Sequence, residues 1–562
     1  MRLPHQQQEI LRMQGLMMQL PLLISGLIAH ADRNHGDTGI VSRLAEDPHG
    51  PLHRTTWRET HRRARQLANA LAHLGVRRGD RVATLAWNTH RHVELYYAVA
   101  GSGAVCHTVN PRLFDEQIAW ILAHADSQVL FFDLTFTDIV ARIAHKLPQV
   151  THFVQMTGRE HLPANFPREL LAYEDLVHRH SEHYAWPQLD ENAASSLCYT
   201  SGTTGHPKGV LYSHRSTVLH AYACALPDSF GISARDTVMP VVPMYHVNAW
   251  GLPYLAALTG SRLVLPGPLL DGASLHRLIV DEGVSFSNGV PTVWSGLLQH
   301  LAQHGGGLGE LRRLAIGGSA CPPAMAEFFA HRGIEVLRTW GMTELSPIGT
   351  VNVPRADDAT LAPDRREAQR LTQGRPLPGV ELAILDDDGQ PLPQDGESFG
   401  ELVVRAPWAL RQYYGREGGD GFTADGWFRT GDVATIDAGG FMQITDRAKD
   451  VIKSGGEWIS SIELENILAA HPAVTEAAAV AVPHPRWDER PLMAVVLKPG
   501  KTLERDAMRR YFSGKIAHWW LPDDLVVVDE IPHTATGKIN KLALRERFRH
   551  HRWPERIAST TA

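Results

Sequence analysis

Cysteine is scarce in this chain. Its 562 residues include four cysteines, and no two of them form a C-x-x-C pair: Cys106, Cys198, Cys224 and Cys321. Cysteine-based zinc sites and disulfide-stapled secreted domains both need cysteines at short, paired spacings. The sequence favours neither, and a reduced cytoplasmic location fits it best.

An excess of positive charge is also missing. The chain has 55 Lys and Arg against 61 Asp and Glu, a net charge of -6. Nucleic-acid-binding proteins usually concentrate basic residues, so we expect no nucleic acid partner. The 31 histidines are scattered without metal-ligand spacing, which indicates surface or helix-face residues for the most part.

Long uninterrupted apolar runs are lacking as well. The apolar stretch at residues 15–29 is broken by Gln19, Pro21 and Ser25, whereas a membrane-spanning helix needs about 18 or more apolar residues in a row. We therefore expect no integral membrane span. We expect instead a helix that packs on its own domain or on a partner subunit.

What the sequence does contain is a long alternation of strand-like and helix-like segments, from about residue 55 to residue 290. RVATLAW (81–87) is typical of a buried strand, and HRHVELYYAVAGSG (90–103) is typical of a following helix. Such alternation predicts parallel sheets covered by helices. Shorter strands separated by Gly and Asp turns, at about 360–450, predict an antiparallel or barrel-like subdomain.

The predicted fold class is α/β. A large N-terminal domain of two parallel α/β sheets plus a β-barrel-like subdomain precedes a small α+β C-terminal domain. The chain is too long for a single core, and we predict an N-terminal domain at residues 1–445, a hinge at 446–451 and a C-terminal domain at 452–562. The hinge segment is charged, which indicates a defined joint and not a flexible Gly/Ser tether.

The segment LCYTSGTTGHPKGV (197–210) carries the strongest chemical signal. An apolar strand enters a loop of hydroxyl-bearing residues, glycines and one lysine, in which backbone N–H groups can converge on an anion. The loop is not a Walker P-loop, because His206 and Pro207 separate Gly205 from Lys208. The alternative, a plain polar hairpin loop, is disfavoured by the density of these residues.

Together with five further segments, this loop resembles motifs of the adenylate-forming enzymes, and the sequences of these segments are most similar to those of bacterial medium- and long-chain fatty-acid–CoA ligases. The segments are VVPMYHVNAWG, IGGSACP, TWGMTELSP, DGWFRTGDVATID and DRAKDVIKSGGEWISS. The resemblance covers nearly the whole chain, with the motifs in the family's order. It implies a two-step reaction in which a carboxylate joins the α-phosphate of ATP, and the thiol of CoA then displaces AMP.

The resemblance also implies roles for individual residues. It assigns adenine stacking to Trp340, the ribose to Asp432 and Arg447, and Mg²⁺ to Thr200 and Glu344, oxygen ligands that suit this cation. The ATP- and AMP-binding set is Thr200, Ser201, Gly202, Thr203, Thr204, Gly205, Lys208, Gly318, Ser319, Thr339, Trp340, Thr343, Asp432, Arg447, Lys449, Lys453 and Trp458. The family more often has Tyr where this chain has Trp340.

By the same resemblance, His246 and Trp250 border an acyl tunnel, with His246 near the carboxylate. They are four residues apart and would share one face if this segment were helical. Gly455 and Gly456 are expected to approach CoA, and Lys449 is the expected pivot of a mobile C-terminal domain. That domain carries Lys538 in PHTATGKINK (532–541). The expected catalytic residues are Lys538, Glu344, Thr200 and His246.

The favoured function is therefore an ATP-dependent medium-chain fatty-acid–CoA ligase. Long-chain fatty acids or 3-methylthiopropionate are alternative substrates. A peptide-synthetase adenylation domain is disfavoured because no acidic residue for a substrate amino group is evident near Trp250. A non-catalytic nucleotide-binding protein is disfavoured because Lys538, Glu344 and Lys449 occur together. The resemblance also implies a homodimer.

Overall fold

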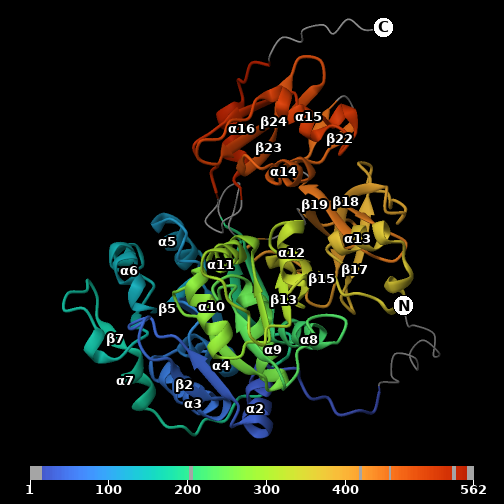
Figure 1. The fold of residues 1–562 in the computed structure, drawn as a ribbon. Coiled ribbons are helices and arrows are strands. Elements are labelled where there is room, and N and C mark those ends of the chain that lie inside the picture. The colour runs from blue at the N-terminus through green and yellow to red at the C-terminus, as the bar shows by residue number, and fades with distance from the viewer. Residues whose placement is uncertain are drawn as a thin grey trace, which may run out of the picture.

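The computed structural model describes residues 15–200, 207–416, 421–447, 449–454, 457–533 and 539–553, and it describes only the backbone of residues 357, 457 and 458. Figure 1 shows a large body that contains most of the helices and a smaller lobe formed by the C-terminal segment. Within the described ranges the strands form four sheets.

The first sheet has the strand order β7-β6-β5-β3-β4-β8-β9. Its strands are β3 (Arg81–Leu85), β4 (Val105–Thr108), β5 (Ser127–Phe132), β6 (His152–Gln155), β7 (Leu170–Ala172), β8 (Ala194–Tyr199) and β9 (Gly209–Ser213). The helices between residues 57 and 178 are α3 (Trp57–His73), α4 (His90–Ser102), α5 (Asp115–His124), α6 (Thr137–Ile143) and α7 (Tyr173–His178). Neighbouring strands are parallel except for the antiparallel pair β8 and β9. This final hairpin carries the glycine-rich loop.

The second sheet has the order β16-β15-β14-β13-β12-β10-β11-β1-β2 and is parallel from β14 to β1. Its strands are β1 (Gly39–Ser42), β2 (His53–Thr56), β10 (Thr237–Pro240), β11 (Arg262–Leu265), β12 (Phe286–Gly289), β13 (Arg313–Ile316), β14 (Glu335–Gly341), β15 (Ile348–Val351) and β16 (Arg375–Pro376). The other helices before residue 380 are α2 (Ile24–His35), α8 (His214–Ala225), α9 (Leu252–Thr259), α10 (Gly272–Asp281), α11 (Pro291–His304), α12 (Pro323–Ala330) and α13 (Pro363–Leu371). Ligands of such sheets bind at the carboxyl ends of the strands.

A four-stranded antiparallel sheet follows, made of β17 (Glu381–Leu385), β18 (Phe399–Arg405), β19 (Phe428–Ile436) and β20 (Met442–Arg447). The C-terminal lobe contains β21 (Ile452–Ser454), β22 (Glu457–Ile459), β23 (Val474–His484), β24 (Asp488–Leu497), β25 (Asp524–Val527), α14 (Ser461–Ala469), α15 (Arg505–Phe512) and α16 (Lys541–Phe548). The mixed α/β class with parallel sheets is thus confirmed, and the hinge at 446–451 stays a prediction.

The connection to the C-terminal lobe is held by buried polar contacts. The carboxylate of Asp446, at the end of β20, accepts a hydrogen bond from the backbone N–H of Ser461 in α14. Lys541 of α16 forms an ion pair with Glu465 of α14, with Nζ and Oε1 2.9 Å apart, and both side chains are largely buried. These contacts fix α14 and α16 to the segment that leaves β20.

The N-terminal expectation is wrong in part. No helix forms at residues 15–23, and the first described helix, α2, begins at Ile24. Just before this helix, the backbone N–H of Leu22 donates a hydrogen bond to Glu191 Oε2 at 2.9 Å. Pro21 cannot donate in a helix, and Leu16, Met17 and other side chains before it are exposed. In the described part of the chain no helix is long and apolar enough to cross a membrane.

Candidate nucleotide and acyl site

The β8–β9 hairpin brings the two ends of the glycine-rich loop together. The backbone N–H of Thr200 donates to the carbonyl of Lys208 at 2.9 Å, and the N–H of Lys208 donates to Thr200 Oγ1 at 3.2 Å. The loop therefore leaves and re-enters the sheet at one point. Its predicted ligands lie outside the described residues and remain predictions: Ser201, Gly202, Thr203, Thr204 and Gly205.

Glu344 is a buried carboxylate held by an aromatic neighbour. It lies in the short helix η5 (Thr343–Leu345) and is 8% exposed. Tyr413 Oη donates to Glu344 Oε1 at 2.7 Å, and the Lys208 ammonium lies 4.8 Å from the centre of the Tyr413 ring. Burial raises the pKa of Glu344, while the Tyr413 hydrogen bond, Arg447 and Lys208 act to lower that pKa.

These groups are suited to a hard cation. Glu344 offers a buried, partly hydrogen-bonded carboxylate, and Thr200 offers a hydroxyl oxygen at the loop entrance. Mg²⁺ typically takes one or two protein oxygens and completes its shell with phosphate and water. In the described ranges no cluster of three or more His, Cys, Asp or Glu residues could hold a metal. The donor set therefore fits a cation that arrives with a phosphate ligand.

A second group of predicted residues meets where β14 approaches β19 and β20. Trp340 Nε1 donates to Asp432 Oδ2 at 2.8 Å, and Arg447 Nε lies 2.8 Å from Asp432 Oδ1. Asp432 and Arg447 are also register partners in the antiparallel pair β19 and β20. Because Asp432 is 3% exposed, these two donors hold the carboxylate in one orientation beside the indole ring.

The loop after β13 approaches the end of β14 closely. A Cβ atom at Gly317 would lie 2.3 Å from Thr339 Oγ1 and 3.2 Å from Trp250 Cη2, so this position requires glycine. Gly318 (φ +79°) and Ser319 follow on the surface. The predicted nucleotide-binding residues Gly318 and Ser319 thus follow a glycine that packs between Thr339 and the expected acyl-tunnel residue Trp250.

His246 and Trp250 do not share a helical face. Residues from Val247 to Trp250 all have positive φ, between 46° and 58°, and form a left-handed turn. The geometry of a right-handed helix, in which residues four apart align, therefore does not apply. His246 is half-buried just before the turn, and Trp250 is buried at its end against Gly317.

The C-terminal predictions rest on fewer described atoms. Burial lowers the pKa of Lys449, whose carbonyl accepts a hydrogen bond from Arg545 Nη1 at 3.1 Å. The backbone N–H of Lys453 in β21 donates to Glu489 Oε2 at 3.0 Å. Gly455, Gly456 and Lys538, as well as the side chain of Trp458, lie outside the described part of the chain.

Comparison of the sequence with known protein families identifies the family of the chain. Residues 28–414 match the AMP-binding enzyme family, and residues 463–538 match the AMP-binding enzyme C-terminal domain. The chain belongs to the AMP-binding enzyme family.

The similarity to relatives of this AMP-binding enzyme extends over nearly the whole chain. A medium-chain-fatty-acid–CoA ligase of Ectopseudomonas oleovorans is 52% identical over 538 residues, 95% of this chain and 98% of that protein. A 3-methylmercaptopropionyl-CoA ligase of Ruegeria lacuscaerulensis is 52% identical over 96% of this chain and 99% of its own length. The crystal structure of an anthranilate–CoA ligase in complex with anthranoyl-AMP is 26% identical, covers 94% of this chain and 98% of its own, and superposes with a TM-score of 0.81.

Two tyrosines of this AMP-binding enzyme contact the Glu344 segment although the sequence gives no signal for it. Tyr413 bonds to Glu344 from 69 positions away, and Tyr212 Oη donates to the carbonyl of Thr343 at 2.6 Å from 131 positions away. Both hydroxyls therefore fix the segment that carries Glu344. Long-range pairs of this kind leave no periodic signal in a single sequence, although adjacent aromatics in RQYYG (411–415) hint at a packed segment.

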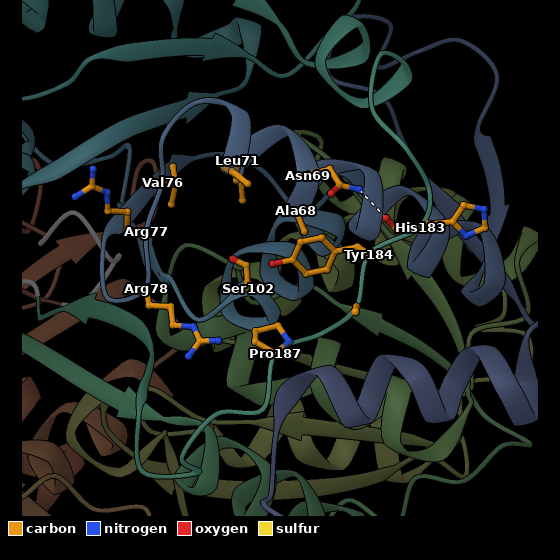
Figure 2. Close-up of a pocket in the computed structure, with 12 residues that line it drawn as sticks. Ala68, Asn69, Leu71, Val76, Arg77, Arg78, Ser102, His183, Tyr184 and Pro187 are labelled. Carbon is orange, nitrogen blue, oxygen red and sulfur yellow. Dashed lines mark hydrogen bonds between the residues drawn. The ribbon is translucent and has the colours of Figure 1, made fainter.

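A separate hollow of about 430 Å³ lies beside the C-terminal ends of α3 and α4. Figure 2 shows Arg77 and Arg78 at one side of it and Tyr184 across from them. Asn69 Nδ2 ties the Tyr184 segment down by donating to the carbonyl of His183 at 3.0 Å. None of the residues that line this hollow belongs to the nucleotide and acyl site.

Proposed function

We propose that this AMP-binding enzyme is an acid–thiol ligase that converts a medium-chain fatty acid, ATP and CoA into acyl-CoA, AMP and pyrophosphate. The observation that carries this proposal is the contact of Lys208 and Glu344 with Tyr413, together with Arg447, which acts on Glu344 and pairs with Asp432 beside Trp340. The relative named for medium-chain acids, 52% identical over 95% of this chain, supports the substrate class.

In the first half-reaction a carboxylate oxygen of the acid attacks the α-phosphorus of ATP, and the bond to the pyrophosphate leaving group breaks. The carboxylate is already ionised at neutral pH, so the obstacle is the approach of one anion to another. Lys208 and Lys538 would supply cationic charge, and loop backbone N–H groups would supply donors. Mg²⁺ held by Glu344 and Thr200 would neutralise phosphate charge when bound. Trp340 and Asp432 would orient the nucleoside.

In the second half-reaction the sulfur of CoA attacks the acyl carbon, AMP leaves, and the thiol proton passes to solvent. One pocket then serves two nucleophiles, which favours a C-terminal domain that turns about Lys449 between the steps. Gly455 and Gly456 would line the approach of CoA, while Lys538 would act only in adenylation. His246 and Trp250 would border the acyl chain. We also propose a homodimer and a cytoplasmic location.

A second candidate substrate is 3-methylmercaptopropionate. A ligase named for its CoA ester is as similar to this chain as the medium-chain enzyme, at 52% identity. Both acids are monocarboxylates with an apolar chain, and a hydrophobic pocket discriminates by only about 1–3 kcal/mol per methylene. Long-chain fatty acids are a further outcome of the same test.

The test is a kcat/KM series on the purified chain, with CoA consumption and AMP formation measured for saturated acids of increasing length and for 3-methylmercaptopropionate. We expect the largest kcat/KM near eight carbons, with at least about tenfold lower values for 3-methylmercaptopropionate and for palmitate. A maximum at 3-methylmercaptopropionate would transfer the proposal to the second candidate. Absence of AMP formation with every acid would contradict the ligase function itself.

A further inference from the structure

The turn that carries Trp250 has an unusual backbone. Val247, Asn248, Ala249 and Trp250 have φ of 46°, 50°, 52° and 58°, and all four are buried. L-residues are disfavoured in this region because Cβ crowds a carbonyl oxygen, and such conformations persist only where the surroundings over-determine them. Four in succession therefore require specific anchors.

The side chain of Asn248 is one such anchor. Its Nδ2 donates to Ser196 Oγ at 3.1 Å, and its Oδ1 accepts from Tyr96 Oη at 3.2 Å and from Cys198 Sγ at 3.5 Å. Ser196 and Cys198 belong to β8, the strand that leads to Thr200. Asn248 therefore ties the turn to the strand that enters the glycine-rich loop.

A second asparagine holds the turn from the other sheet. Asn288, in β12, donates from Nδ2 to the carbonyl of Ala249 at 3.1 Å, while its Oδ1 accepts from the N–H of Val241 at 3.1 Å. The turn is thus clamped between β8 of the first sheet and β12 of the second. Of the two clamps, only Asn248 lies inside the strained segment.

The handedness of the turn determines where Trp250 points. In the left-handed form its ring lies against Gly317, where a Cβ would be 3.2 Å from Cη2. A return of Asn248 to right-handed φ would redirect the chain two residues before Trp250. From this geometry we infer that Asn248 is a positioning residue that locks the left-handed turn and that, because Trp250 is proposed to border the acyl chain, it thereby sets the chain-length preference of the enzyme. This inference rests on the proposed acyl-CoA ligase function.

The decisive variants are Asn248→Ala and Asn248→Gly. Glycine tolerates positive φ but lacks the amide, so it separates backbone strain from anchoring. Both variants should raise KM for octanoate about tenfold and reduce the kcat/KM ratio of octanoate to laurate about tenfold, with KM for ATP changed less than about twofold. If the glycine variant behaves like wild type, strain and not the amide is what matters, and the inference fails.

Asn352→Ala is the matched control. Asn352 is also a buried asparagine, whose Nδ2 donates to the carbonyls of Gln369 and Thr372, but it lies outside the turn. This variant should lose thermal stability while keeping the wild-type chain-length profile. A similar flattening of the profile by Asn352→Ala would assign the effect to general destabilisation and overturn the inference.

A double variant tests the route through Trp250. In a Trp250→Ala background, Asn248→Ala should cause no further change in how kcat/KM depends on acyl chain length, because the indole ring that Asn248 positions is gone. An additional tenfold change would contradict the inference. Should Asn248→Ala not fold, Ser196→Ala removes one partner of the amide and should shift the profile in the same direction. Wild-type activity with fatty acids tests the ligase function separately: its absence would refute that function, whereas an unchanged profile in the variants would refute only the role of Asn248.

Discussion

Replacing Tyr413 by Phe isolates one hydrogen bond at the centre of the site. The change removes the donor that lies 2.7 Å from Glu344 Oε1 but keeps the ring that faces the Lys208 ammonium at 4.8 Å. Because Glu344 is only 8% exposed, water cannot readily replace the lost donor. A hydrogen bond to a charged group contributes about 1.5–3 kcal/mol, so kcat/KM for adenylation should fall about 10- to 150-fold.

The pH profile gives this prediction a sign. The Tyr413 hydrogen bond acts to lower the pKa of Glu344 against the raising effect of burial. Its loss should raise that pKa further, so that less Glu344 is ionised at a given pH. The acid limb of the ATP–pyrophosphate exchange profile should therefore move to higher pH in the variant, and more Mg²⁺ should be needed at any one pH.

Tyr414→Phe provides the matched control. Its backbone N–H donates to the carbonyl of Gly209 at 2.8 Å, and its ring lies 5.7 Å from that of His124, contacts that phenylalanine retains. Exchange rates and acid limb should stay as in wild type. If Tyr413→Phe also left both unchanged, the hydrogen bond to Glu344 would have no part in adenylation.

Three other predictions concern the nucleotide corner, the C-terminal domain and stability. Trp340→Phe removes the donor to Asp432 and should raise KM for ATP about tenfold while leaving KM for the acid unchanged; equal changes in both would contradict the assignment to adenosine. Lys538→Ala should abolish acyl-adenylate formation but largely spare thioester formation from supplied acyl-AMP, and equal loss of both steps would contradict the domain rotation. The free energy of unfolding should also fall in acid, because burial lowers the pKa of four histidines. The pKa falls to about 4 for His92 and His214 and to about 3 for His107 and His220. Below the unfolded pKa of about 6.5 the unfolded chain binds protons that the folded chain does not, so urea unfolding should show a loss of about 1.4 kcal/mol per histidine between pH 7.5 and 5.5. An unfolding free energy that is flat over this range would refute the buried neutral state.

The sheets could be predicted because their signal is local. The strand RVATLAW is largely apolar on both faces, and β3 is buried as that pattern indicates. The resemblance assigns Asp432 and Arg447 to the ribose, and their pairing follows from one antiparallel register. In these places local pattern and tertiary structure agree.

The turn at Asn248 could not be predicted for the opposite reason. Its backbone conformation is fixed by two long-range hydrogen bonds. Asn248 bonds to Ser196, 52 positions away, and Ala249 bonds to Asn288, 39 positions away. Local propensity would give a right-handed turn, and the tertiary contacts override it. The non-helical segment at residues 15–23 shows the same limit, since an apolar composition does not by itself specify a helix.

The central claim is a reaction through an acyl-adenylate, and trapping that intermediate tests it most directly. The enzyme would be incubated with octanoate, ATP and Mg²⁺ without CoA, and the products would be identified by mass spectrometry before and after CoA is added. We expect enzyme-bound octanoyl-AMP and one equivalent of pyrophosphate first, then octanoyl-CoA and AMP. Formation of ADP and octanoyl phosphate, or of octanoyl-CoA without any AMP, would contradict the account.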